Sequence, residues 1–283
     1  MNRRKFLRLA AKAGATTLLG GGIYGAVEAK NLGVTKLSVR IPKLPPPFHG
    51  MKVAFLSDLH HSAEVPAPFL RRAVAMTNAL EPDLIVLGGD YVTAGWRYIL
   101  QGTGNKYIGP CFDILKNLRA KHGVFAVLGN HDQRAGAAAI GAAIRSTGFH
   151  LISNSGVWLG AGDDRLRVCG VEDLSTQRPD IVPALGDATS SDAVLLVSHN
   201  PDFAETITDT RVGLVLSGHT HGGQVSLPVV GALILPSGYG QKYRYGYVQS
   251  PKTQTYVTSG VGTLPLAVRI GAPAEIALIT LQA

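Results

Sequence analysis

Cysteine is scarce in this chain of 283 residues, which contains only Cys111 and Cys169. The two lack the Cys-x-x-Cys spacing of a zinc knuckle or of a redox pair. We therefore expect two buried thiols that pack as small apolar side chains. A single disulfide in an oxidising compartment is the alternative.

Charged residues are also few, at 16% of the chain, and no dense basic stripe with interleaved aromatic residues is present. This excludes a highly charged disordered chain, since 46% apolar residues can build a sizeable core. It also gives no reason to predict nucleic-acid binding. Of the net charge of +8, residues 1–29 carry +4, which leaves +4 for the rest. A mild positive excess favours an anionic substrate or an anionic membrane surface.

The chain lacks an apolar run long enough to predict a permanent membrane span. Residues 1–12 are basic, residues 13–26 are small and apolar, and Val27-Glu28-Ala29 resembles a cleavage site, which is the layout of a secretory leader. Asn2–Arg8 (NRRKFLR) resembles the twin-arginine export motif. A basic amphipathic helix on the cytoplasmic face is the alternative, which Gly20-Gly21-Gly22 disfavours.

We therefore predict that residues 1–29 are a twin-arginine-type signal or anchor, read by the twin-arginine export machinery. The protein would then be bacterial and would reside in the periplasm or on the outer face of the cytoplasmic membrane. Residues 30–50 are expected to form a linker and a first strand, with the proline-rich segment 42–47 extended. The catalytic domain would span residues 51–283.

Beyond Met51, short apolar runs alternate with helical patterns. The runs predict buried strands at 53–56, 84–87, 124–128, 166–171, 194–197, 214–216, 255–258 and 276–280, and the periodicity predicts helices at 68–80, 112–120 and 135–147. Strands that are apolar on both faces and alternate with helices indicate sheets covered by helices. The fold class is therefore α/β.

Polar residues gather where five of these predicted strands end. The clusters are Ser57-Asp58-Leu59-His60, Gly88-Gly89-Asp90, Gly129-Asn130-His131-Asp132, Ser198-His199-Asn200 and Ser217-Gly218-His219-Thr220-His221. Ligands of open α/β sheets bind beyond the carboxyl ends of the strands, so we expect the clusters to converge. Asp58 and His60 are two residues apart, as are His219 and His221, and at a strand end the members of such a pair point the same way.

The clusters supply carboxylates, one amide and several imidazoles, but no thiolate. Structural zinc sites prefer sulfur, and calcium sites need more oxygen. The donor set therefore favours Mn, Fe or Zn. Each cluster alone also fits turn residues, helix caps or core histidines, but all five in order favour a metal centre.

The series Asp58-x-His60, Gly89-Asp90, Gly129-Asn130-His131-Asp132, His199 and Gly218-His219-x-His221 resembles the signature of calcineurin-like metallophosphoesterases. Ser198–Asp202 and Ser217–Gln224 (SGHTHGGQ) resemble a bacterial branch of single-domain phosphodiesterases with exported and membrane-associated members. The resemblance runs from about Met51 to the C-terminus. It implies a four-layer α/β/β/α sandwich of two mixed sheets, with a dinuclear metal site at the carboxyl ends of the strands.

The resemblance also implies a ligand set: Asp58, His60 and His221 for one ion, Asn130, His199 and His219 for the other, and Asp90 between them. A metal-bridging hydroxide would attack phosphorus, and His131 would protonate the leaving alkoxide. Asp132 would either hydrogen-bond near the site or cap the following helix. His61 is expected to be solvated or to contact a ligand.

Hydrolysis of a phosphodiester in a lipid, a nucleotide or a cell-envelope polymer is the leading hypothesis. Pyrophosphate cleavage in a nucleotide-linked lipid, as in UDP-diacylglucosamine hydrolases, is the second, but its cytoplasmic substrate conflicts with an export leader. A phosphomonoesterase is the third, and a non-catalytic scaffold is disfavoured because no ligand is missing. Tyr239, Tyr243, Tyr245 and Tyr247 are expected either to pack a loop or to contact substrate or membrane. The sequence leaves the oligomeric state open.

Overall fold

The computed structural model describes residues 22, 24–94 and 105–283. The twin-arginine-like motif at residues 2–8 lies outside them, so the export signal stays a prediction. In the part of the chain that is described, no helix has both the length and the apolar character that a membrane span requires.

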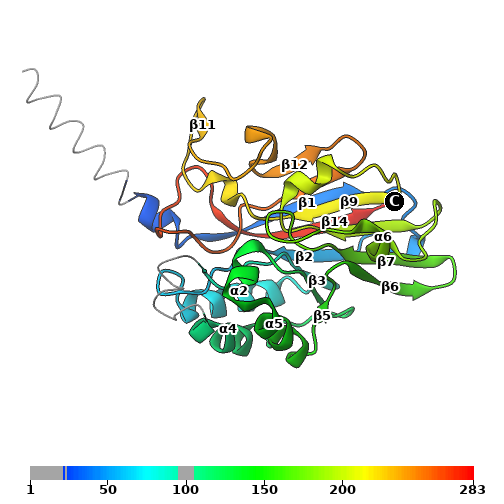
Figure 1. The fold of residues 1–283 in the computed structure, drawn as a ribbon, viewed down its shortest axis with the longest axis horizontal. Helices are drawn as coiled ribbons and strands as arrows, with labels where there is room; N and C mark the ends of the chain where they lie inside the picture. The colour runs from blue at the N-terminus through cyan, green and yellow to red at the C-terminus, as the bar shows by residue number, and fades with distance from the viewer. Residues whose placement is uncertain (1–21, 23, 95–104) are drawn as a thin grey trace, which may run out of the picture.

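Six strands form the first sheet, in the order β1-β14-β2-β3-β4-β5 (Figure 1). Their bounds are β1 Leu32–Arg40, β14 Ala274–Gln282, β2 Lys52–Leu56, β3 Leu84–Leu87, β4 Val124–Ala126 and β5 His150–Leu151. Strands β2 to β5 are parallel, whereas β14 runs antiparallel to β2 and parallel to β1. The carboxyl ends of β2, β3 and β4 therefore meet at one edge.

The second sheet also has six strands, in the order β12-β13-β9-β8-β7-β6. Their bounds are β12 Gly246–Gln249, β13 Gln254–Val257, β9 Val212–Ser217, β8 Ala193–Val197, β7 Asp164–Gly170 and β6 Ser155–Ala161. The four inner strands are parallel, and both edge strands are antiparallel to their neighbours. A separate hairpin follows β9 in the chain and consists of β10 (Ser226–Leu227) and β11 (Gly231–Ala232).

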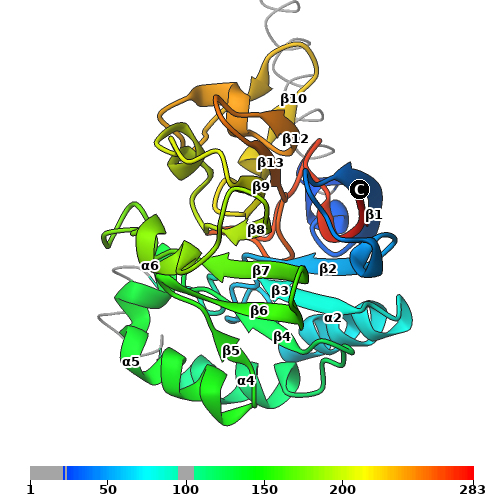
Figure 2. The ribbon, with the colours of Figure 1, turned by 90° about the vertical axis from the view of Figure 1, so that its right-hand side faces the viewer.

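The two sheets pack face to face around one apolar core, to which Phe55 and Val86 contribute from the first sheet and Leu195 and Leu216 from the second. Helices α2 (Ala67–Ala79), α4 (Ile108–Leu115) and α5 (Asn130–Ser146) cover the outer face of the first sheet (Figure 2). Among the described residues, the outer face of the second sheet is packed against the short helix α6 (Ile181–Leu185) and the 3-10 turn η3 (Pro201–Glu205). The predicted sandwich of two mixed sheets is confirmed, with a thin fourth layer.

Two segments depart from what the sequence pattern predicts. Helix α5 begins at Asn130 rather than at residue 135, because the carboxylate of Asp132 accepts the backbone N–H of Gly129 and caps the helix there. The proline-rich segment contains a 3-10 turn, η1 (Pro46–Phe48), and Leu44 and Phe48 beside it are buried between the sheets. These two apolar side chains therefore tie the segment to the core.

The two cysteines are free and buried, and they lie in different parts of the core. The expectation of two buried thiols is confirmed. Burial raises the pKa of both thiols, to about 12 for Cys169, so they remain protonated at neutral pH.

Candidate metal centre

The five polar clusters converge at the carboxyl ends of the inner strands. Asp58 and His60 follow β2, Asp90 follows β3, Asn130 and His131 follow β4 in the first turn of α5, His199 follows β8, and His219 and His221 follow β9. Donor atoms of two overlapping groups, Asp58-His60-His221 and Asp58-Asp90-His199, lie within 4.8 Å of one another. The five side chains of these two groups are buried.

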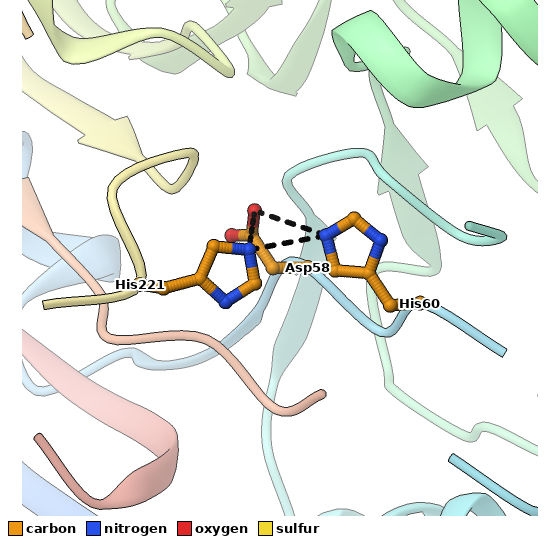
Figure 3. A group of neighbouring side chains, drawn as sticks. All are labelled: Asp58, His60 and His221. Carbon is orange, nitrogen blue, oxygen red and sulfur yellow. Dashed lines mark hydrogen bonds and ion pairs between the residues drawn. The ribbon is translucent and has the colours of Figure 1, made fainter. Parts of the chain in front are cut away.

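In the first group two imidazoles face each other beside a carboxylate (Figure 3). The Nε2 atoms of His60 and His221 are 3.1 Å apart, and they lie 3.9 Å and 3.4 Å from Oδ1 of Asp58. The Nδ1 atoms of both rings are buried without a hydrogen-bond partner among the described residues. Because at most one of the facing nitrogens can donate to the other, this arrangement leaves lone pairs that a cation would satisfy.

Asp90 connects this group to a second one. Its Oδ2 lies 3.5 Å from Nε2 of His60 and 3.4 Å from Nε2 of His199. On the far side, Oδ1 of Asn130 lies 3.2 Å from Nε2 of His199 and 2.9 Å from Nδ1 of His219. One carboxylate oxygen therefore faces both donor groups.

Backbone contacts fix the orientation of these side chains. Nδ1 of His199 lies 2.8 Å from the carbonyl oxygen of Gly88, which can only accept, so Nδ1 carries a proton and Nε2 is the nitrogen that points at Asp90. The other oxygen of Asp90 accepts the N–H of His131 at 2.8 Å. Both oxygens of Asp58 accept the N–H of His219 at 3.1 Å.

Asp132 performs both of the roles that were left open for it. Its carboxylate accepts the N–H groups of Asp90 at 2.6 Å, Tyr91 at 2.9 Å and Gly129 at 2.9 Å. It therefore holds the loop after β3 against the start of α5 and caps that helix at the same time. This fixes the position of Asp90 relative to Asn130.

Left-handed backbone is concentrated at the candidate ligands. Positive φ angles occur at Asp58 (55°), His60 (48°), Asp90 (55°), His219 (70°) and His221 (52°). Such a conformation costs a residue other than glycine on the order of 1–3 kcal/mol and persists only where the surrounding structure enforces it. The directions of these side chains therefore come from tight turns, and not from strand alternation as the spacing suggested.

The expectation that His219 and His221 point the same way is wrong. His219 contacts Asn130, whereas His221 contacts His60 and Asp58. The left-handed residues and the 3-10 turn η4 (His221–Gly223) reverse the chain between the two side chains. One histidine therefore enters each donor group.

The electrostatics of the centre fit a bound cation. Burial raises the pKa of Asp58 to about 6, and burial lowers the pKa of His60 and His221 well below the usual value. Burial also opposes the ionisation of Asp90, but Asp90 and His199 stabilise each other's charge, so that the pKa of Asp90 lies well below its usual range and the pKa of His199 well above it. Carboxylates and imidazoles are donors that divalent metal ions bind, and a bound ion would take the place of the proton that His199 shares with Asp90.

His131 stands next to these groups without joining either. Its ring lies edge-on to His60 with centroids 4.8 Å apart, and its Nδ1 accepts the N–H of Ala94 at 3.0 Å. With Nδ1 acting as an acceptor, the neutral ring carries its proton on Nε2. His61, by contrast, is not solvated: it is buried against Tyr107 and contacts the carbonyl oxygen of Val65.

Arg269 supports the centre in a way that the sequence pattern does not reveal. This guanidinium is fully buried and donates to the carbonyl oxygens of Ser259, Gly260 and Ala272 at 2.8–3.0 Å and to that of Gly262. The loop that it holds donates from Gly262 N to the carbonyl oxygen of Asp58 at 2.7 Å. Arg269 therefore positions the backbone that carries a candidate ligand.

A cavity of about 720 Å³ opens from the centre. His131 and Arg134 line it on one side, and apolar residues of the segments 225–236 and 264–268 line the other. The tyrosines singled out in the sequence do not line it. Tyr243 is fully buried and hydrogen-bonds to Glu205 and Ser250, whereas the remaining three are exposed.

Comparison with known proteins identifies the family. The model of the calcineurin-like phosphoesterases matches residues 51–223, which include all seven candidate ligands. The chain belongs to the calcineurin-like phosphoesterases. It is a metal-dependent phosphoesterase, and its buried Asp and His clusters fit a dinuclear metal site.

Individual relatives within the calcineurin-like phosphoesterases agree. The chain is 32% identical over 288 residues to the uncharacterized metallophosphoesterase YkuE of Bacillus subtilis, covering 100% of this chain and 98% of that protein. It is 31% identical over 233 residues to the phosphodiesterase YaeI of Escherichia coli, covering 81% of this chain and 82% of that one. The solved structure of an archaeal phosphodiesterase aligns with 82% of this chain and 100% of its own chain, at 12% identity and a TM-score of 0.41.

Proposed function

We propose that this chain hydrolyses phosphodiesters with two divalent ions held by Asp58, His60, Asp90, Asn130, His199, His219 and His221. The observation that carries the proposal is the position of Asp90, whose Oδ2 faces His60 on one side and His199 on the other at 3.4–3.5 Å. A carboxylate shared by two sets of nitrogen and oxygen donors is the arrangement that a dinuclear centre needs. Mn, Zn and Fe suit this donor set.

The two bound ions would supply positive charge for the phosphate oxygens and would lower the pKa of a water molecule. The chain's own residues set the geometry. Asp132 and the N–H of His131 hold Asp90 between the two donor groups, and the carbonyl oxygen of Gly88 keeps Nε2 of His199 directed at Asp90.

His131 is assigned to the leaving group. It lines the cavity beside the donor groups, and the N–H of Ala94 occupies its Nδ1, so Nε2–H is the atom free to reach a phosphoester oxygen. That atom either donates a hydrogen bond throughout the reaction or passes a proton to the leaving alkoxide. Proton transfer requires a doubly protonated ring, which would break the contact with Ala94.

A diester substrate is favoured by the charge of the cavity. Among the described lining residues, Arg134 is the one cationic side chain outside the histidines, and Asp90 is the one acidic side chain. A single arginine beyond the metal ions suits a diester, which carries one negative charge, better than a doubly charged monoester. The relative YaeI, 31% identical, is named a phosphodiesterase, which supports the same class.

We further propose that the protein is exported through the twin-arginine pathway and acts on a component of the bacterial envelope. The support is the basic and then apolar sequence of residues 1–29 with paired arginines at positions 3 and 4. Signal-sequence processing and localisation of the full-length protein would test this part. Cytoplasmic retention of the protein would refute it.

The experiment that tests the activity uses the full chain, stripped of metal and then supplied with Mn, Zn, Fe, Ni, Mg or Ca in turn. We expect metal-dependent cleavage of bis(p-nitrophenyl) phosphate in preference to p-nitrophenyl phosphate. Preference for the monoester would keep the metal centre but change the substrate class. Failure to bind any of these metals would refute the assignment of the centre.

A further inference from the structure

The cavity at the metal centre has two chemically different walls. One wall carries the candidate ligands together with His131 and Arg134. The other wall, formed by the apolar part of the lining, carries Leu233, Ile234, Leu264, Leu266 and Val268. A volume of about 720 Å³ is in the range that holds a molecule well beyond a phosphate group. The occupant that matches both walls is an amphiphile with a phosphoester at one end.

The apolar wall continues onto the surface. Ile234 is 82% exposed, Leu266 66% and Val230 64%, and Val229 at the hairpin tip is fully exposed. Residues 225–236 (VSLPVVGALILP) contain no charged side chain, and their one polar side chain, Ser226, is buried. Contiguous exposed apolar surface on this scale marks an interaction site in a soluble domain. Because it offers few polar groups to a partner, it suits a lipid phase better than a specific protein surface.

Hydrogen bonds attach this surface to the catalytic end of the molecule. Gln224, three residues after His221, donates its side-chain amide toward the carbonyl oxygens of Leu266 and Val268, and its side-chain oxygen accepts the N–H of Leu264. The N–H of Ser226 at the base of the hairpin donates to the carbonyl oxygen of Ile270. The hairpin and the segment 264–268 therefore form one apolar rim at the mouth of the cavity.

The N-terminal segment enters the fold at the same rim. Residues 24–28 are helical, and the carbonyl oxygen of Gly25 accepts the N–H of Arg269 at 2.9 Å. Tyr24 and Val27 are both more than half exposed there. Figure 1 shows this short helix, in blue, and the hairpin that contains β11 at the same end of the molecule. Residues 24–28 are thus hydrogen-bonded to the residue that directly follows the segment 264–268.

We propose that the rim formed by residues 225–236 and 264–268 rests on a lipid bilayer, and that the substrate is a phosphodiester of an acyl-chain lipid. The phosphate would lie between the metal centre and Arg134, with an acyl chain along Leu233, Ile234 and Leu266. The substrate class rests on the proposed function, since it needs a phosphodiesterase centre. Contact with the bilayer does not depend on the activity.

The substrate class is tested with two diesters that share one leaving group, p-nitrophenyl methyl phosphate and p-nitrophenyl hexadecyl phosphate. Each methylene buried from water contributes about 0.8 kcal/mol, so burial of three or four methylenes predicts a kcat/KM about 100-fold higher for the hexadecyl ester. The double variant Ile234→Ser/Leu266→Ser should lower this ratio at least tenfold, because kcat/KM for the hexadecyl ester should fall far more than kcat/KM for the methyl ester. The matched control is Val182→Ser, because Val182 is 72% exposed on α6 and does not line the cavity.

Contact with the bilayer is tested by hydrogen–deuterium exchange of the full chain with and without vesicles of phosphatidylethanolamine and phosphatidylglycerol (3:1). We expect protection of residues 225–236 and 264–268 in the presence of vesicles, and none in α6. This local readout is independent of membrane binding by residues 1–29 and of metal loading.

Three results would overturn the inference. The inference would be refuted if the wild-type protein had nearly equal kcat/KM for the hexadecyl and methyl esters and if vesicles left residues 225–236 and 264–268 unprotected. Cleavage of the methyl ester in that case would show that the proposed phosphodiesterase activity stands without the lipid contact. Protection of these segments that rises with protein concentration in the absence of vesicles would assign the rim to self-association instead. Cleavage of neither ester with any metal would refute the proposed function and the substrate class together, while vesicle protection would still decide the contact with the bilayer.

Discussion

Gly129→Ala is the substitution that most directly tests whether the centre depends on close packing. A Cβ atom at this position would lie 2.2 Å from Oδ1 of Asp90 and 2.7 Å from Cε1 of His199. The backbone of Gly129 has φ −99°, which alanine adopts without strain, so the effect would come from crowding alone. To reach even a tight van der Waals contact, Oδ1 of Asp90 and the new Cβ atom must move about 1 Å farther apart. A displacement of that size at a reacting centre lowers the rate about 100-fold.

We therefore expect Gly129→Ala to lower kcat about 100-fold for bis(p-nitrophenyl) phosphate and to leave fewer than two metal ions bound per chain. Crowding should also destabilise the fold by about 1–3 kcal/mol. Hydrolysis rates, metal analysis by mass spectrometry and urea unfolding would measure the three effects separately.

The matched control is Gly109→Ala in α4. A Cβ atom there meets nothing within 4 Å, so the same substitution should leave the activity unchanged and raise stability by about 0.5–1 kcal/mol. If Gly129→Ala bound two metal ions and turned over at the wild-type rate, Asp90 would not be held by the close approach that the structure describes, and the argument from crowding would fail.

Three further substitutions test individual groups. Asp90→Ala should abolish metal-dependent hydrolysis, because one oxygen of Asp90 faces both donor groups; metal content and rate would measure this. His131→Ala should keep both ions but slow turnover, whereas His131→Gln, which can donate a hydrogen bond but no proton, should recover part of the rate if Nε2–H acts as a donor only. Arg269→Met should destabilise the chain by about 3 kcal/mol or more in urea unfolding, because buried carbonyl oxygens lose their donor.

Each of these expectations has a contrary result. Two ions and full activity in Asp90→Ala would exclude a shared ligand at this position. Loss of metal in His131→Ala would identify His131 as a ligand. Proton transfer by His131 would be identified if the rate loss grew with the pKa of the leaving alcohol and His131→Gln recovered none of the rate. Wild-type stability of Arg269→Met would show that the loop holds its shape without the guanidinium.

The fold could be predicted from the sequence because its inner strands are apolar on both faces. The runs at 53–56, 84–87 and 194–197 read directly as buried strands, and all three lie in the observed sheets. Strand β6 carried no such signal, since Ser155–Ala161 is only half buried and contains two glycines. Its place in the sheet comes from pairing with β7, which is a tertiary contact.

The candidate site was predictable in membership but not in geometry. Polar clusters after parallel strands placed Asp58, Asp90 and His199 at one edge, and the structure brings them together. The left-handed backbone at Asp58 and His60 and the divergence of His219 from His221 have no signature in residue spacing. The apolar rim does have a signature in the sequence, namely twelve consecutive uncharged residues at 225–236. From the sequence we considered a contact with substrate or membrane only for the tyrosines that follow this segment.

The position of β14 has a consequence for biosynthesis. This strand is synthesised more than two hundred residues after β1 and β2, yet it lies between them, and its Glu275 is bound by the side chains of Thr35 and Thr258. The first sheet therefore cannot close while the ribosome still holds residues 274–282, and residues 32–40 must wait for a partner more than two hundred positions downstream. Until then the edge of β2 is open to other chains, a state that a cytoplasmic chaperone would have to cover. Closure of the first sheet is consequently timed by the synthesis of β14, and not by that of the strands that lie beside it.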